Sequence, residues 1–168
     1  MGKEKVLETN LTPNDRAKTG KDHAEPIKGF GKTEIYQLYD FLVAYEDSGI
    51  GRDKNNTKKL LQIHPELSGL LENFKKVQYH KSNNEEMQSL RFKELRNEIF
   101  LTKNKANLQL SFLAHLRNAI AHGHVIEHNK KVLVTDFQVK RPVNFSARGC
   151  IDLEVINEFT STLKNIEL

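Results

Sequence analysis

The chain has little cysteine, since its 168 residues include only Cys150. A single thiol cannot form an intramolecular disulfide, and nothing in the sequence points to an oxidising compartment. Long apolar runs are also missing, so we expect neither a membrane-spanning helix nor a membrane partner. The first ten residues lack the hydrophobic region of a secretion signal, and Val6 stands where N-myristoylation needs Ser or Thr. These absences predict a cytoplasmic protein.

The overall composition is that of a folded, mildly basic protein. Hydrophobic residues make up 38% of the chain and charged residues 29%, which is typical of one globular domain of this length. The formal charge of +4 permits an anionic partner, but the lysines are scattered rather than clustered. Residues 1–32 show almost no apolar periodicity and are predicted to be a flexible N-terminal arm. Residues 33–168 are predicted to be the folded domain.

Apolar residues recur at helical spacing through most of that domain. The pattern predicts helices over 33–47, from Pro65 to about residue 77, over 85–100, over 108–122 and over 152–166, with Asp152 as the N-cap of the last one. Residues 79–84 are expected to be a loop. After Gly123 the period changes from 3.6 to two, which predicts two short strands around a turn near Asn129-Lys130. A further short strand is expected over 147–151. The predicted fold is mainly α, an up-and-down helical bundle with a small β-hairpin before the last helix.

The helix over 108–122 carries an unusual polar stripe. Ser111, His115, Asn118 and His122 fall on one side of it, opposite a leucine-rich stripe. Ordinary solvated faces are dominated by Lys and Glu, so two histidines in one stripe suggest a function. Arg117 lies at the margin of the apolar stripe and diverges from His122 by about 140° on a regular helix. The two can meet if the arginine bends round, or at a cleft shared with a second copy of the helix.

Arg117, Asn118 and His122 together suit the cleavage of a phosphodiester. Histidine exchanges a proton near neutral pH, and arginine grips a phosphate and stabilises the extra negative charge of the transition state. Asparagine can orient the attacking hydroxyl or the histidine. No carboxylate cluster accompanies them in the sequence, so neither a magnesium-dependent mechanism nor any other cofactor is implied. RNA supplies its own nucleophile, the 2′-hydroxyl, and is therefore the expected substrate.

These residues resemble a known family. The run from Arg117 to His122, RNAIAH, resembles the R-x4-6-H motif of the HEPN superfamily, including the polar residue after the arginine and the trailing Gly123. The order of elements over residues 33–168 resembles that family too. The resemblance implies a HEPN-like α-helical bundle that forms a homodimer, in which the motif helices of two subunits line a joint cleft.

The resemblance also implies an activity. Many members are metal-independent endoribonucleases of toxin–antitoxin or anti-phage systems that leave 2′,3′-cyclic phosphate ends, and some pair with an antitoxin protein. By this likeness Arg117 and His122 carry catalysis and Asn118 assists. One toxin branch has a tyrosine two residues after the histidine, where a partner enzyme attaches AMP. Here that position is His124, so regulation by modification at this site is not expected.

Structural interpretations stand beside these functional ones. Arg117 can cap backbone carbonyls or pair with a carboxylate such as Glu94 or Glu98, and His122 can be a helix C-terminal residue favoured by the helix dipole. The alternative function is a non-catalytic HEPN module that binds RNA, a nucleotide or a protein partner. A purely structural bundle is a third alternative.

The remaining candidates are given structural roles. His115 is expected to be structural or peripheral, and His124 and His128 are expected on the hairpin surface. A metal site formed by His122, His124 and His128 is conceivable but is not favoured. Cys150 is expected to be a small, partly buried apolar residue.

Overall fold

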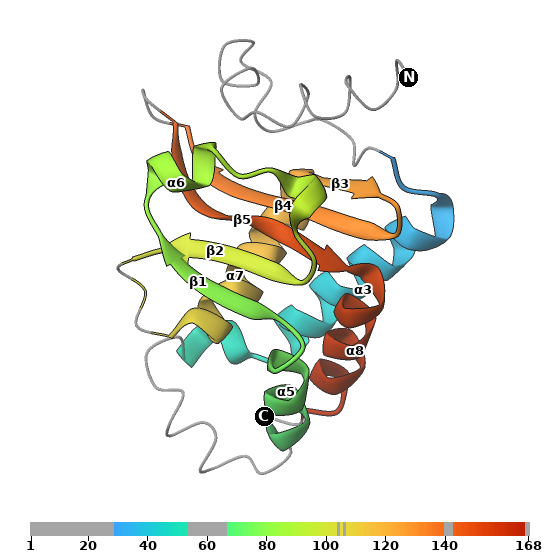
Figure 1. Cartoon of the computed structure of the whole chain (residues 1–168). Coiled ribbons are helices and arrows are strands. Elements are labelled where there is room, and N and C mark those ends of the chain that lie inside the picture. Colours follow the sequence, from blue (N-terminus) through green and yellow to red (C-terminus); the bar gives the residue numbers. More distant parts are fainter. Residues whose placement is uncertain (1–28, 54–66, 104, 106, 140–142, 167–168) are drawn as a thin grey trace.

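A mixed β-sheet stands where a helical bundle was predicted. The computed structural model describes residues 29–53, 67–103, 105, 107–139 and 143–166. Within this part of the chain, five strands in the order β1-β2-β5-β4-β3 form one sheet, and five α-helices surround it (Figure 1). The prediction of a mainly α, HEPN-like up-and-down bundle is therefore wrong, because the fold is α/β. Most of the predicted arm, residues 1–28, lies outside the described residues.

The elements follow the labels of Figure 1. The helices are α3 (Lys32–Asp47), α5 (Ser68–Phe74), α6 (Asn84–Gln88), α7 (Leu108–Ala121) and α8 (Leu153–Lys164). The strands are β1 (Gln78–Ser82), β2 (Glu98–Thr102), β3 (Val125–His128), β4 (Lys131–Gln138) and β5 (Asn144–Asp152), and two short 3₁₀ turns are η1 (Ile50–Asp53) and η3 (Phe92–Glu94). The predicted helices α3, α7 and α8 and the β3–β4 hairpin are confirmed. The predicted strand over 147–151 is confirmed as part of the longer β5, whereas α5 is shorter than expected.

The sequence prediction fails between residues 78 and 102. The expected loop is strand β1, and the expected helix over 85–100 is divided into α6, η3 and β2. Asn97 has a left-handed backbone (φ 52°) that no helix tolerates, and β2 after it buries alternate residues, Ile99 and Leu101. Strands β1 and β2 run parallel. Parallel neighbours need a crossover connection, and the chain uses α6 and η3 for it.

One face of the sheet packs against the helices. Helix α7 passes behind the sheet in Figure 1, and contacts β4 and β5 as well as β1 and β2. Its Leu113 and Leu116 are fully buried, and they share one core with Val132 and Val134 of β4 and Ala147 of β5. Helix α3 packs on both α7 and α8. Because the apolar side of α7 is buried in this core, the direction of its polar side chains is fixed.

The opposite, outer face is covered by the crossover. Arg148 of β5 is 4% exposed, and its guanidinium lies 4.6 Å and 4.7 Å from the ring centroids of Phe92 and Phe145. Its Nη1 donates to the carbonyl oxygen of Met87 (2.6 Å). Gly149 follows, and a Cβ at that position would overlap the carbonyl oxygen of Glu98 on β2. The outer face is therefore closed by a buried cation, whereas the close approach at Gly149 lies on the inner side, against Ile99.

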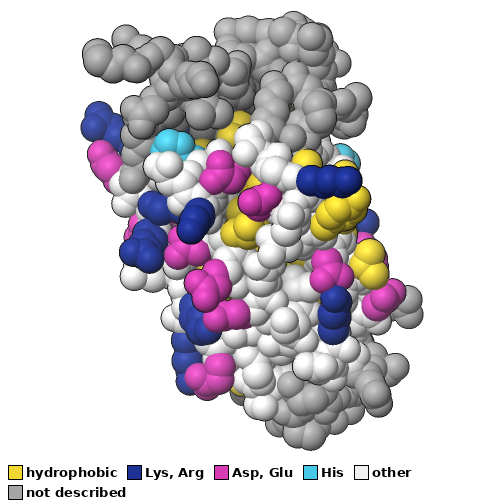
Figure 2. All heavy atoms as spheres, turned by 90° about the vertical axis from the view of Figure 1, so that its right-hand side faces the viewer, with side chains coloured by type: hydrophobic (Ala, Val, Ile, Leu, Met, Phe, Trp, Pro, Cys, Tyr) yellow, Lys and Arg dark blue, Asp and Glu magenta, His cyan; other side chains and the backbone are white. Residues whose placement is uncertain are grey.

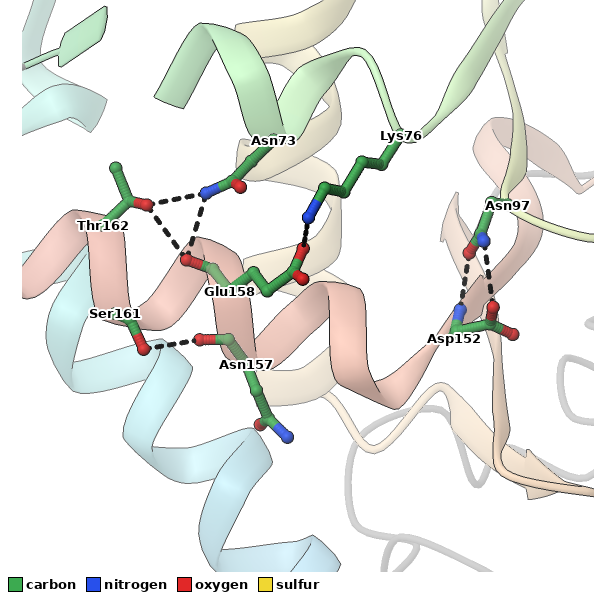
Figure 3. Close-up of polar contacts among 8 residues, drawn as sticks. All are labelled: Asn73, Lys76, Asn97, Asp152, Asn157, Glu158, Ser161 and Thr162. Carbon is green, nitrogen blue, oxygen red and sulfur yellow. Dashed lines mark hydrogen bonds and ion pairs between the residues drawn. The ribbon is translucent and has the colours of Figure 1, made fainter. Parts of the chain in front are cut away.

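Polar contacts hold α8 against its neighbours (Figure 3). The predicted N-cap residue, Asp152, does precede α8, but its side chain does not cap the helix. Its Oδ2 accepts from Asn97 Nδ2 (2.9 Å), and its backbone N–H donates to Asn97 Oδ1 (2.7 Å) (Figure 3). Farther along the helix, Asn73 Nδ2 donates to Thr162 Oγ1 (2.6 Å). These contacts tie α8 to both α5 and the turn before β2.

Two sequence expectations concern buried or apolar residues. Cys150 is fully buried rather than partly buried, and burial raises the pKa of its thiol to about 11. No helix among the described residues has both the length and the apolar character needed to cross a membrane.

Candidate functional site on helix α7

Helix α7 has a defined start and end, which fix the direction of its polar stripe. Asn107 is the N-cap, and its Oδ1 accepts from the backbone N–H of Leu110 (2.9 Å). At the other end His122 is the C-cap residue, and Gly123 adopts the left-handed conformation (φ 69°) that favours glycine. The predicted glycine stop is confirmed, so His115, Asn118 and His122 lie one turn apart along one side of the helix.

The buried centre of the site is a carboxylate that faces α7 from the sheet. Asp136 of β4 is 7% exposed, and the register of β4 and β5 shifts directly after it. Because a carboxylate only accepts hydrogen bonds, the Nδ1–H of His115 donates to Asp136 Oδ2, at 2.6 Å. Asn118 Nδ2 donates to the same oxygen at 3.4 Å. One acceptor on the inner side of β4 therefore lies between two residues of the α7 stripe.

Asn118 connects this buried pair to an accessible arginine. Its Oδ1 accepts from Arg117 Nη1 (3.3 Å), so the two ends of one amide group join Asp136 and Arg117. Arg117 Nε donates to Glu46 Oε1 of α3 (2.7 Å). A guanidinium carries five N–H donors, and those not used here have no hydrogen-bond partner among the described residues. The arginine is therefore oriented but still able to bind a ligand.

A small hollow lies beside the arginine. It has a volume of about 230 Å³ and is lined by Tyr45, Glu46, Gly49, Gly51, Ala114, Arg117 and Asn118. Burial raises the pKa of the Tyr45 hydroxyl, the negative charge of Glu46 raises it further, and the positive charge of Arg117 opposes both. Tyr45 therefore stays protonated at neutral pH and can donate a hydrogen bond. The hollow offers a cation, an amide and a phenol to one ligand.

His122 has different surroundings from the other two predicted residues. It is exposed, and its ring lies 5.7 Å from the ring of His124, which stacks on Phe137 at 4.4 Å. The structure thus joins Arg117 to Asn118 by a hydrogen bond and places His122 one turn beyond them, within a row of rings. His124 is buried (7% exposed), so its predicted place on the hairpin surface is wrong.

The sequence pattern did not predict two members of the hydrogen-bond network around Arg117 and Asn118. Glu46 is 71 residues from Arg117 in the sequence, and no local pattern joins them; Glu94 and Glu98 were expected instead. Asp136 did leave a signal, because it follows Val132 and Val134 on the inward side of an alternating strand, where a carboxylate needs a partner. That partner is His115, which was expected to be structural or peripheral and which forms a buried pair with Asp136.

The metal site considered for the histidines does not form. Within the described ranges, no three side chains of the His, Cys, Asp or Glu type gather closely enough to hold a metal ion.

The chain has no significant match among protein-family models, curated proteins or solved structures. The likeness to the HEPN superfamily accordingly rests on the motif residues of α7.

Proposed function

We propose that the protein is a metal-independent endoribonuclease that uses Arg117, Asn118 and His122. The observation that carries this proposal is the oriented guanidinium of Arg117, whose remaining N–H donors have no partner among the described residues and lie beside a hollow of about 230 Å³. An exposed imidazole, His122, lies one helical turn from Asn118. The proposal takes the chemistry of the motif and leaves aside the helical-bundle fold that usually accompanies it.

In this proposal His122 removes the proton of the RNA 2′-hydroxyl, and the resulting oxygen attacks the adjacent phosphorus. The bond from phosphorus to the 5′-oxygen breaks, and that oxygen takes up a proton. The products are a 2′,3′-cyclic phosphate and a 5′-hydroxyl. Arg117 binds the non-bridging oxygens, on which negative charge increases in the transition state. Asn118 holds the guanidinium in place, and Asp136 holds Asn118.

A homodimer belongs to the same proposal. Cleavage needs a base for the nucleophile and an acid for the leaving group, and one imidazole performs one of these roles at a time. A second copy would bring a second His122 to the same phosphate. Helix α3, which supplies Glu46 to the site, leaves Tyr36, Tyr39 and Val43 exposed at 63%, 50% and 57%, and this stripe is the surface we assign to the second copy.

The enzyme is tested by incubating purified protein with RNA in EDTA and analysing the ends of the products. Wild-type protein should release 2′,3′-cyclic phosphate ends, and Arg117→Ala or His122→Ala should reduce the rate by about 100-fold or more. Arg91→Ala and His128→Ala are matched controls, because both residues lie outside the network. If the controls lose activity as fully as the site variants, the assignment of Arg117 and His122 fails.

The biological role proposed with this activity is that of a toxin or anti-phage effector, with an antitoxin protein as its partner. Expression of the wild-type chain should then arrest growth, and Arg117→Ala or His122→Ala should relieve the arrest. Equal toxicity of the wild type and both variants would contradict an RNA-cleaving toxin.

One observation favours a second function, a non-catalytic module that binds RNA, a nucleotide or a protein partner. Arg117 is already paired with Glu46, so its charge is balanced before any substrate arrives. A protein that binds RNA through Arg117 and leaves it intact, with and without EDTA, would support this alternative.

A further inference from the structure

The pairing of Arg117 with Glu46 is the most informative contact of the site. Arg117 Nε and Glu46 Oε1 lie 2.7 Å apart, and the side chains are 38% and 57% exposed. Ion pairs this open to water contribute about 0–1 kcal/mol, because water and salt screen them. The contact is therefore well formed in geometry but weak in free energy, and a competing anion can break it.

Glu46 offers Arg117 the same chemistry that a phosphate would. A guanidinium binds carboxylates and phosphates in the same way, through pairs of N–H groups that face two oxygens. Glu46 occupies the Nε side of this fork, while Asn118 uses one hydrogen of Nη1. A phosphate that engages Arg117 through both Nε and Nη2 must therefore take the place of the Glu46 carboxylate.

The surroundings leave room for this exchange. Glu46 belongs to the last turn of α3, its side chain faces solvent, and the hollow beside it is bordered by Gly49 and Gly51, which have no side chain. Since a water molecule takes up about 30 Å³ in the liquid, a hollow of about 230 Å³ can hold a phosphate group together with several waters. Asn118, by contrast, is held from behind by Asp136 and keeps the guanidinium in place.

We propose that Glu46 is an internal competitor that holds Arg117 until a nucleic-acid phosphate displaces it. The inference rests on the proposed function for the identity of the ligand, and it adds a means of regulation. A ligand without an anionic group does not displace Glu46, and a ligand with one does so at a reduced affinity. The site is thereby kept from weak, non-specific binding of small anions.

Binding of an RNA that cannot be cleaved tests the competition apart from catalysis. The probe is a short single-stranded RNA with 2′-O-methyl groups, which lacks the nucleophile, and affinity is measured by fluorescence anisotropy at fixed salt. Glu46→Gln keeps the shape of the side chain and removes its charge. We expect it to bind about two- to fivefold more tightly than the wild type, in line with an exposed ion pair.

Asp47→Asn is the matched control, since it removes the same charge from the neighbouring exposed residue of α3. The control should gain clearly less than Glu46→Gln. In an Arg117→Ala background, Glu46→Gln should gain no more than Asp47→Asn does. Unchanged or weaker binding by Glu46→Gln overturns the proposal and makes Glu46 a positioning residue for Arg117. An equal gain in Asp47→Asn overturns it too, as does a gain by Glu46→Gln that is undiminished by the loss of Arg117.

The same variants separate this inference from the proposed function. Tighter binding by Glu46→Gln without cleavage of ordinary RNA by any variant would support the competition and refute the nuclease. Cleavage by the wild type, with no change in probe binding by Glu46→Gln, would support the nuclease and refute the competition.

Discussion

Arg117 and Arg148 belong to opposite faces of the sheet and carry the same charge in opposite surroundings. Arg117 belongs to α7, which packs on the inner face. Its side chain is partly exposed and pairs with the carboxylate of Glu46. Arg148 lies on the outer face, is 4% exposed, and has no carboxylate partner among the described residues. Its partners are two aromatic rings and the carbonyl of Met87.

The difference separates a cation that stabilises the fold from one that can bind a ligand. Burial lowers the pKa of the Arg148 guanidinium to about 10, so it remains charged at neutral pH and its desolvation costs free energy. Only fixed neighbours such as Phe92 and Phe145 can offset that cost. Arg117 keeps access to water and to exchangeable anions. Acidic and basic side chains are interspersed over the face that Figure 2 shows.

The largest expected effect is on stability at Arg148. Arg148→Ala should lower the free energy of unfolding by about 2–4 kcal/mol, because it removes the ring contacts and leaves a cavity and an unpaired carbonyl. Arg148→Met should lose much less, since an apolar chain of similar length avoids the desolvation cost. Urea unfolding of both variants measures this, with the exposed Arg91→Ala as the control. Equal losses for Ala and Met would mean that charge, and not packing, matters at this position.

A smaller loss of stability is expected on the inner face, at Asp136. Asp136→Ala leaves the buried donor of His115 and the partly buried donor of Asn118 without their acceptor, which should cost about 1–3 kcal/mol. The neighbouring Thr135→Val is the control, because Thr135 Oγ1 is buried with no hydrogen-bond partner among the described residues. That variant should be close to neutral in the same unfolding experiment. A loss as large for Thr135→Val would show that the strand, and not the His115–Asp136 pair, is sensitive.

Substitution of Arg117, unlike that of Arg148, should affect activity much more than stability. Arg117→Ala should change the free energy of unfolding by less than about 1 kcal/mol, because its ion pair is exposed. The same variant should nevertheless lose RNA cleavage by about 100-fold or more. Thermal unfolding and cleavage assays on one preparation give both values. A large loss of stability in this variant would remove the contrast between the two arginines.

The smallest effect concerns the crossover that covers Arg148. Hydrogen bonds from the backbone N–H of Asn83 and from the Ser82 hydroxyl lower the pKa of Glu86 from its ordinary value of 4.5. Its contribution to stability is thus fully present above about pH 4.5 and is lost as the pH falls through the lowered folded pKa. Glu86→Gln should lower the melting temperature slightly at pH 7 and hardly at all at pH 3. Glu85→Gln removes a charge from the same first turn and is the matched control, which should lower the melting temperature less than Glu86→Gln at pH 7.

The elements that could be predicted have an uninterrupted local pattern. Helix α7 has a continuous apolar stripe and a glycine stop, and β3 and β4 alternate around a turn at Asn129-Lys130. The segment from β1 to β2 misled the prediction because Met87, Leu95 and Ile99 are all buried and fall at helical spacing, but they belong to different elements. The parallel pairing of β1 with β2 leaves no local pattern in the sequence. Without that pairing, the β3–β4 hairpin was interpreted as a small addition to a helical bundle.

The site was predicted in part for the same reason. Arg117, Asn118 and His122 share one helix, so their spacing could be read directly. Glu46 comes from α3 and Asp136 from β4, and only the packing of those elements on α7 brings them to Arg117 and Asn118. The contacts that orient the guanidinium are therefore tertiary.

The place of β5 in the sheet has a consequence for how the protein is made. Among the strands of the described residues, β5 is made last, yet it lies at the centre and is bonded to β2 on one side and to β4 on the other. Before residues 144–152 emerge, the nascent chain holds two separate ribbons, β1–β2 and β3–β4, each with an uncovered edge. A growing chain that pauses near Val143 would expose those edges to pairing with other chains, and the sheet can close only after β5 has emerged.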